Sequence, residues 1–206
     1  MEKLTDLFPA LTESQKARYE AMEELYRTWN ARINVISRKD MDNLLTHHIL
    51  HSMAIAKVID FPAGSTVLDV GTGGGFPGIP LAILFPDCRF KLIDGTGKKV
   101  RVAQEVARTI GLENCVCEHL RAEDEKGKFE FVVSRAVMPL PDLVKLVRKN
   151  MSRVQRNAIP NGIICLKGGD LQAETMPFRK LAEVVSLEKW FSEEWFKGKQ
   201  CVYLPM

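Results

Sequence analysis

The chain has 206 residues, of which 46% are hydrophobic, and this size and composition suit one globular domain with an extension. Its net charge of +3 permits an acidic partner without requiring one. No apolar stretch reaches the roughly 20 residues of a membrane span, and residues 1–6 lack the layout of a signal peptide, so we expect a cytoplasmic protein that does not bind membranes.

Residues 1–60 are predicted to form a small helical extension. A helix over 12–29 is expected because Thr12 and Gln15 match a capping box and the apolar residues that follow share one face. A second helix is expected over about 42–59, where another apolar stripe recurs at helical spacing. Pro62 and Gly64 would end it and lead into the main domain, residues 61–206.

From residue 61 onward, strand-like and helix-like segments alternate. Strands are expected near 66–70, 89–94, 115–120, 129–134 and 162–167, and helices near 77–85, 98–110, 140–150 and 170–182. Two further strand candidates, 184–190 and 200–204, follow them. The alternation predicts an α/β fold with a mostly parallel, Rossmann-like sheet covered by helices on both faces, and the last two strands predict an antiparallel C-terminal hairpin.

A glycine-rich turn follows the first strand, and five of residues 71–78 are glycine. Glycine admits positive φ and lets a ligand approach the backbone, so the turn is expected to hold a nucleotide-like cofactor; a turn without a ligand is the alternative. A dinucleotide-binding fingerprint would need glycine where the chain has Phe76, so an NAD-dependent dehydrogenase is disfavoured. The run from Leu68 to Gly75 instead resembles the first motif of class I S-adenosylmethionine (SAM) methyltransferases.

Residues at the ends of the next two strands extend this prediction. Asp94 ends the second strand, and in a doubly wound fold an acid there bonds ribose hydroxyls; a turn or helix-capping acid is the alternative. Ala122 and Glu123 follow the third strand, where the ribose or adenine of SAM would lie. Otherwise Glu123 is an ordinary surface acid.

Two cations end the fourth and fifth strands. Arg135 is predicted to bind either the SAM carboxylate or an RNA phosphate, with a surface salt bridge as the alternative. Lys167 precedes two glycines and is expected either to meet a phosphate or to belong to a simple turn. Arg135 and Lys167 are the candidates for catalytic residues.

The histidines and cysteines favour no metal site. His47 and His51 share a helical face, but no nearby Cys or Glu completes a metal-binding set, so a histidine pair is favoured. His48 lies on the apolar stripe and is expected to be packed and hydrogen-bonded, against Asn30 and its neighbours at the end of the first helix. The five cysteines lack paired CxxC spacing, so buried reduced thiols are expected.

The motifs and their order along the chain resemble those of the bacterial glucose-inhibited division protein B family. Members of this family are SAM-dependent guanine-N7 methyltransferases of 16S ribosomal RNA. The resemblance covers about residues 20–204 and rests on Tyr26-x-x-Trp29-Asn30, His48 with Ser52, the run Leu68 to Ala82, Asp94, Lys98-Lys99-Val100, Arg121-Ala122-Glu123, Ser134-Arg135-Ala136 and Leu166-Lys167-Gly168. The chain departs from much of the family at positions 47 and 51, where histidine stands in place of Arg and Asp.

The resemblance implies methylation of N7 of one guanine in 16S ribosomal RNA, as free RNA or in the small ribosomal subunit, by a protein that we expect to be a monomer. Gly71, Gly73, Phe76, Ala122, Glu123 and Arg135 would line the SAM site, and we expect Asp94 to join them. Arg32, His48 and Lys167 are expected to contact the RNA, together with the scattered cations Arg27, Arg38, Lys39, Arg153, Arg156, Arg179 and Lys180. Guanine N7 has a lone pair and no proton, so no general base would be needed.

Two other functions stay open on the sequence. One is a SAM methyltransferase of a protein or a small molecule, since a fold does not fix its substrate. The other is a non-catalytic RNA-binding assembly factor that retains the fold, against which the intact glycine motif argues.

Overall fold

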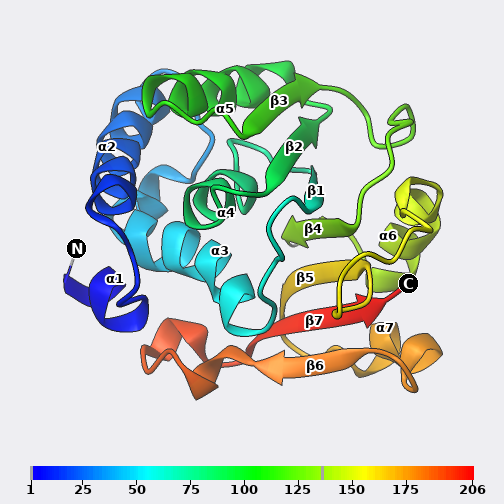
Figure 1. Ribbon diagram of the computed structural model, residues 1–206. Coiled ribbons are helices and arrows are strands. Elements are labelled where there is room, and N and C mark those ends of the chain that lie inside the picture. The colour runs from blue at the N-terminus through cyan, green and yellow to red at the C-terminus, as the bar shows by residue number, and fades with distance from the viewer. Residues whose placement is uncertain (1, 136) are drawn as a thin grey trace.

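The computed structural model describes residues 2–135 and 137–206 (Figure 1). These residues form a seven-stranded sheet with the strand order β3-β2-β1-β4-β5-β7-β6. The strands are β1 (Thr66–Val70), β2 (Arg89–Asp94), β3 (Cys115–His119), β4 (Phe131–Arg135), β5 (Gly162–Gly168), β6 (Glu183–Ser186) and β7 (Lys199–Pro205). The first five pair in parallel, whereas β7 runs antiparallel to both β5 and β6. The predicted α/β sheet is therefore confirmed.

The helices lie on both faces of this sheet. The α-helices are α1 (Glu2–Leu7), α2 (Glu13–Asn30), α3 (His51–Met53), α4 (Gly78–Leu84), α5 (Gly97–Thr109), α6 (Leu140–Val147) and α7 (Gln172–Thr175). Shorter turns of 3₁₀ or π type are η1 (Arg38–Asn43), η2 (Leu44–Leu50), η3 (Ala54–Lys57), η4 (Arg148–Asn150), η5 (Met176–Phe178), η6 (Leu187–Lys189) and η7 (Glu194–Phe196). Figure 1 shows α1 to α5 gathered on one side, with α6 and α7 on the other.

Two hydrophobic cores correspond to the two faces. Val67 of β1 and Phe131 of β4 belong to one core, and their neighbours Leu68 and Val132 belong to the other. Successive side chains of a strand point to opposite faces, so a sheet that is covered on both sides needs apolar residues at every position. The N-terminal helices, α4 and α5 contribute to the first core, and α6 contributes to the second.

The first predicted helix is confirmed, including its cap. The Gln15 backbone N–H donates to the Thr12 hydroxyl at 3.2 Å, and the Thr12 backbone N–H donates to the Gln15 side chain at 2.9 Å. This completes a capping box at the start of α2. Tyr19, Met22 and Tyr26 are buried on its inner face.

The second predicted helix is wrong as a continuous α-helix. The chain forms a 3₁₀ helix (η1), a π-helix (η2), a single α-helical turn (α3) and another 3₁₀ helix (η3) in succession. The apolar stripe is buried as expected, for example at Ile49 and Met53. A stripe at helical spacing records which face is buried, but it does not record which carbonyl each N–H bonds.

Elements near the C-terminus are shorter than predicted. The helix expected over 140–150 ends its α-helical part at Val147 and continues as η4, and that expected over 170–182 ends at Thr175 and continues as η5 to Phe178. Pro177 lies in η5 and has no N–H to donate, which explains the break in α-helical bonding. β6 and β7 pair as predicted, but η6 and η7 lie between them, so the connection is not a tight hairpin.

Three further predictions concern the cysteines, membrane spans and the domain boundary. All five cysteines are free thiols, four of them buried and Cys115 half-buried. Of the described helices, none has the length and apolar character to cross a bilayer. The extension shares the first core with α4 and α5, and the division at residue 60 stays a prediction.

Candidate active site

The glycine turn lies at the carboxyl edge of the sheet, beside the point where the strand order reverses. β1 is flanked by β2 and β4, and open α/β sheets bind ligands in the crevice at such a switch point. Gly71 and Gly73 have φ of 71° and 58°, a left-handed backbone that a side chain would strain. A Cβ on Gly71 would lie 2.5 Å from Val137 Cγ2, so a larger residue would collide there.

Asp69 ties the two ends of this turn together. Its buried Oδ2 accepts hydrogen bonds from the Thr72 hydroxyl at 2.6 Å and from the Gly78 N–H at 2.8 Å. Its other oxygen, Oδ1, has no hydrogen-bond partner among the described residues. Burial raises the pKa of Asp69 to about 7, even though both hydrogen bonds act to lower it.

Asp94 closes the turn from β2. Its Oδ2 accepts from the Gly73 N–H at 2.9 Å, and its Oδ1 accepts from the Thr96 N–H at 2.7 Å. The turn-acid role, which the sequence left open, is therefore present in the structure. A carboxylate has further acceptor positions, and the contact of Asp94 with a ribose stays a prediction.

A cleft of about 260 Å³ opens beside the turn. Its lining includes the apolar residues Ile93, Leu120 and Leu146, and four of the residues predicted to bind the cofactor, Gly71, Asp94, Ala122 and Glu123. The cleft thus combines an apolar wall with two carboxylates at the ends of β2 and β3. Such a lining suits a nucleoside with free hydroxyls.

Phe76 and Arg135 form a second group, beneath the turn. Phe76 is buried, and its ring centroid lies 4.7 Å from that of Tyr26 and 5.1 Å from Arg135 Cζ. Arg135 donates from Nη1 to the His47 carbonyl at 3.3 Å and from Nη2 to His48 Nδ1 at 3.2 Å.

The charge of Arg135 is not neutralised by an adjacent acid. Burial lowers its pKa to about 10, although Asp69, Tyr26 and Asp40 act in the opposite direction. No carboxylate of the described residues forms an ion pair with it, so the surface salt bridge considered as an alternative is absent from this part of the chain. Ala136, which follows it in the resemblance motif, lies outside the described residues.

Comparison with known proteins decides the family. The model of the GidB family, described as rRNA small subunit methyltransferase G, matches residues 15–200. The chain belongs to this family. A ribosomal RNA small subunit methyltransferase G from Bacteroides fragilis is 59% identical over 206 residues and covers 100% of both chains. One from Bacteroides thetaiotaomicron is 60% identical over 203 residues and covers 98% of each. The family predicted from the motifs is confirmed.

Solved structures agree in fold with this GidB family member. A SAM-dependent methyltransferase from Aquifex aeolicus has a TM-score of 0.55 at 18% identity, covering 82% of this chain and 98% of that chain. An rRNA methylase from Streptococcus thermophilus has a TM-score of 0.51 at 12% identity, covering 76% and 93%. At such identities the likeness concerns the fold alone, and the predicted class I methyltransferase sheet is confirmed.

In this family member, the segment after α2 lies against the glycine turn. A Cβ on Gly74 would be 2.9 Å from Val35 Cβ, and the Tyr26 hydroxyl donates to the Gly74 carbonyl at 2.5 Å. The exposed cations Arg32, Arg38 and Lys39 lie on this segment. The segment that bears these three cations thus contacts the glycine turn through Val35, and their contact with RNA stays a prediction.

The hydrogen bonds of the Asn30 amide, at the end of α2, do not go to His48, and the predicted packing of this helix end against His48 stays a prediction. Asn30 instead donates to the Ile36 carbonyl and accepts from the Val35 and Ile36 N–H groups, all at 2.9 Å. Asn30 therefore shapes the segment that bears Arg32.

Lys167 is engaged within the protein. Its Nζ lies 2.8 Å from Glu174 Oε2 and donates to the Met138 carbonyl at 2.5 Å. Glu174 also accepts from the Leu140 N–H at 2.6 Å. Lys167 thereby holds the segment that follows β4, and its roles in catalysis and RNA contact stay predictions.

Two of the other predicted RNA-binding cations are paired with acids. Arg156 lies 2.8 Å from Glu130, whose other oxygen accepts from the Thr66 N–H at the start of β1, so this pair belongs to the amino edge of the sheet, away from the turn. Arg27 pairs with Glu23 at 3.1 Å.

The histidines contact aromatic rings and one acid. The His47 ring stacks on that of Trp195 with centroids 4.1 Å apart, and the His51 ring meets the edge of Trp195 at 5.0 Å. His47 Nδ1 lies 2.5 Å from Asp40 Oδ1, and His48 Nε2 lies 2.8 Å from Asp40 Oδ2. Within the described residues, no group of three or more His, Cys, Asp or Glu is placed to hold a metal ion.

Two residues of the site were missed by the sequence analysis, Asp40 and the hydroxyl of Tyr26. Tyr26 was predicted as part of an apolar face and named in the family resemblance, but its hydroxyl was given no role. A tyrosine in an apolar face needs a partner for its hydroxyl, and this was the available signal. Asp40 lies in η1, and nothing in its local sequence pattern points to the two histidines.

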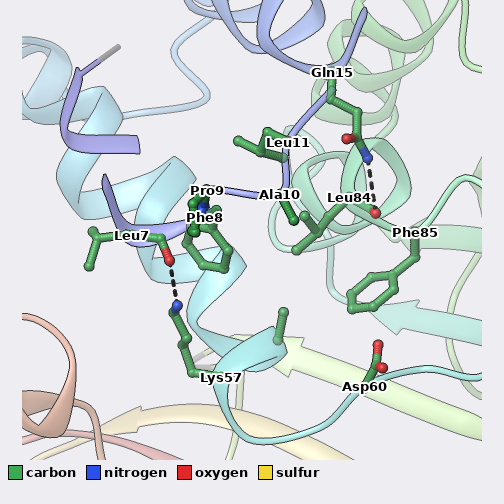
Figure 2. A pocket seen from close by; sticks show the side chains of 11 residues that line it. Leu7, Phe8, Pro9, Ala10, Leu11, Gln15, Lys57, Asp60, Leu84 and Phe85 are labelled. Carbon is green, nitrogen blue, oxygen red and sulfur yellow. Dashed lines mark hydrogen bonds between the residues drawn. The ribbon is translucent and has the colours of Figure 1, made fainter. Parts of the chain in front are cut away.

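A separate cavity of about 400 Å³ is lined by residues of the N-terminal segment, η3 and the end of α4 (Figure 2). Leu84 and Phe85, at the end of α4, form part of its wall. Lys57 donates to the Leu7 carbonyl and lies 4.3 Å from the centroid of the Phe8 ring. α4 leads away from the glycine turn, so this cavity is remote from the cofactor cleft and shares no lining residue with it.

Proposed function

We propose that this chain transfers the methyl group of SAM to N7 of one guanine in 16S ribosomal RNA, with the cleft at the glycine turn as the cofactor site. Family membership and fold make the chain a SAM-dependent methyltransferase of small-subunit ribosomal RNA. The observation that carries the residue assignments is the meeting of Gly71, Asp94, Ala122 and Glu123 around one cleft.

The cleft fits the parts of the cofactor. A side chain on Gly71 would collide with Val137 in the wall of the cleft, and Asp94 and Glu123 offer carboxylates to ribose hydroxyls. Leu120 and Leu146 supply apolar surface for the adenine ring. Arg135 lies beneath the turn and not in the lining of this cleft. Its guanidinium, which has no acidic partner in an ion pair among the described residues, suits the carboxylate of the cofactor's amino acid tail. When bound, SAM would supply an electrophilic methyl group on a positively charged sulfur, with S-adenosylhomocysteine as the leaving group when the guanine N7 lone pair takes the methyl carbon.

In the proposed reaction the protein aligns the guanine with the methyl group and does not transfer a proton. Guanine N7 carries no proton, so neither Asp94 nor Glu123 has to act as a base. The positive charge passes from sulfur to the guanine ring, and the net charge at the reacting atoms is unchanged. Fixing the two reactants in line and excluding water are then the main sources of rate acceleration.

We also propose how the RNA approaches, in which oligomeric state the chain acts, and where in the cell. Exposed Arg32, Arg38 and Lys39 beside the turn support an approach of RNA from that side. We infer that the chain acts as a monomer, and in the cytoplasm, where bacterial ribosomal RNA is found.

The test is transfer of a labelled methyl group from SAM to three acceptors: small ribosomal subunits that lack their own N7 methylation, protein-free ribosomal RNA and a protein mixture. We expect label in ribosomal RNA and none in protein, and no transfer by a folded Arg135→Ala variant. Label in protein would contradict the proposal. SAM binding without transfer would indicate a different substrate, and the absence of both would favour a non-catalytic factor.

A further inference from the structure

Three charged or titratable groups from distant parts of the chain form one hydrogen-bonded series beneath the glycine turn. Asp40 comes from η1, His48 from η2 and Arg135 from the end of β4. Asp40 Oδ2 lies 2.8 Å from His48 Nε2, and Arg135 Nη2 lies 3.2 Å from His48 Nδ1. The imidazole thus bridges an acid of the N-terminal extension and the arginine proposed to bind the cofactor.

The partners of His48 fix its protonation state. An arginine has only donors, so His48 Nδ1 has to be the bare, accepting nitrogen. Asp40 accepts, so His48 Nε2 has to carry the proton. The ring is therefore neutral in this arrangement. Burial first, then the charge of Arg135, lower the pKa of His48 to about 4, while Asp40 opposes this shift and His47 adds to it.

Asp40 is held as a carboxylate by the same contacts. Burial acts to raise its pKa, but hydrogen bonds from His48 and His47 outweigh this, and the pKa lies below the ordinary value. Asp40 is therefore a reliable acceptor at neutral pH, and it orients both histidine rings.

We propose that Asp40 and His48 are positioning residues that hold the Arg135 guanidinium in place while leaving its charge available to the cofactor carboxylate. A carboxylate in the place of His48 would orient Arg135 equally well but would neutralise it. A neutral imidazole, backed by an acid one hydrogen bond further away, orients the guanidinium without pairing its charge. This inference rests on the proposed function, because it takes Arg135 as a cofactor ligand.

The other contacts of Arg135 are weaker, so His48 is the side chain that mainly orients its guanidinium. The His47 carbonyl accepts from Nη1 at a longer 3.3 Å, and the Phe76 ring lies 5.1 Å from Cζ. The ring gives the guanidinium a face to lie on but does not set its rotation. Loss of the His48 acceptor should therefore free Arg135 to turn.

The main experiment compares the binding of S-adenosylhomocysteine with that of 5′-methylthioadenosine, which lacks the amino acid tail. Calorimetry is run on the full chain and on His48→Ala, Arg135→Ala and the double variant. We expect His48→Ala to weaken S-adenosylhomocysteine binding about ten- to a hundredfold, as for a lost hydrogen bond to a charged group, and to leave 5′-methylthioadenosine binding unchanged. The double variant should bind no more weakly than Arg135→Ala alone.

Matched variants separate positioning from folding. His48→Asn places an amide near the position of Nδ1 and should recover part of the lost affinity. Asp40→Ala should reduce S-adenosylhomocysteine binding selectively, whereas Asp42→Ala should not, because the Asp42 side chain is 96% exposed and its ion pair is with Arg27.

The inference is overturned if His48→Ala weakens the binding of both ligands equally, or if the losses of affinity in His48→Ala and Arg135→Ala add in the double variant. Either result would indicate a merely structural histidine. If Arg135→Ala leaves S-adenosylhomocysteine binding intact, the assigned cofactor role of Arg135 fails as well. If Arg135→Ala weakens binding but His48→Ala does not, the proposed function stands and this inference alone fails.

A second measurement does not depend on ligand binding. ¹⁵N NMR of the histidine rings should show His48 as the neutral tautomer with the proton on Nε2, unchanged from pH 7 down to about pH 5. A proton on Nδ1, or a ring that charges near its ordinary pKa of about 6.5, would overturn the proposed arrangement.

Discussion

Two buried tyrosines of α2 make the same kind of hydrogen bond at different distances from the cofactor turn. The Tyr26 hydroxyl donates to the Gly74 carbonyl at 2.5 Å, and the Tyr19 hydroxyl donates to the Pro80 carbonyl at 2.8 Å. Burial raises the pKa of both hydroxyls, so both stay protonated donors at neutral pH. Changing either residue to Phe removes the hydroxyl and leaves a buried carbonyl without that donor.

Each Tyr→Phe change should lower the free energy of unfolding by about 1–2 kcal/mol, the cost of a buried carbonyl that has lost its donor. The midpoint of thermal unfolding should fall by roughly 2–8 °C for a chain of this size. Only Tyr26→Phe should also weaken SAM binding, because Gly74 belongs to the turn, whereas Pro80 lies within α4. The loss of binding free energy cannot exceed the cost of the lost hydrogen bond, which limits the weakening to about five- to thirtyfold.

Urea unfolding and isothermal titration calorimetry of the two variants, side by side, measure both effects. Tyr19→Phe is the matched control, since it has the same chemistry, the same helix and a similar burial. If both variants lose SAM affinity equally, or neither does, the reasoning that Tyr26 holds the turn for the cofactor is refuted.

Three further predictions follow from other contacts. Asp94→Ala should weaken SAM binding about tenfold or more, because it removes the acceptor of the Gly73 N–H together with the proposed ribose partner; unchanged affinity in calorimetry would show that neither matters. For Asp69, the pKa of about 7 lies above the ordinary value of about 3.9, so the folded chain keeps a proton that the unfolded chain loses between roughly pH 4 and 7. The contribution of protonated Asp69 to the free energy of unfolding is complete below about pH 4 and is lost as the pH rises through 7. The stability of Asp69→Asn relative to the unmodified chain should therefore improve by up to roughly 3 kcal/mol between pH 5 and 8, and a pH-independent difference in urea unfolding would count against this. Raising the salt concentration should weaken RNA binding, and Arg32→Ala or Lys39→Ala should each reduce the slope of log affinity against log salt by about 1; unaltered slopes would remove these cations from the RNA surface.

The cofactor side of the site could be predicted from the sequence, because its information is local. Buried strands, a glycine turn and acids at strand ends are each visible in a few residues. The ends of neighbouring parallel strands then meet at one edge, which is why Gly71, Asp94 and Glu123 line one cleft. The mostly parallel sheet followed from the alternation of strands and helices, and its antiparallel edge from the last two strand candidates.

The rest depended on packing between segments that are far apart in the chain. The sequence predicted that Arg135 and Lys167 end neighbouring strands, but not that Lys167 pairs with Glu174 or that Arg135 meets His48. The helix expected over 42–59 failed for a related reason. Its buried stripe was recognised, but the hydrogen-bonding pattern depends on tertiary packing, such as that of α3 against α4.

The central claim, methylation of a single guanine at N7, is tested most directly by mapping the modified base. Small ribosomal subunits that lack N7 methylation are incubated with the chain and SAM, and their RNA is then reduced, cleaved with aniline at N7-methylguanine and mapped by primer extension. The account predicts one discrete cleavage site, absent without SAM and absent with Arg135→Ala. If the methyl group of labelled SAM enters the RNA but aniline does not cleave it, the methyl group lies on another atom and the account is contradicted.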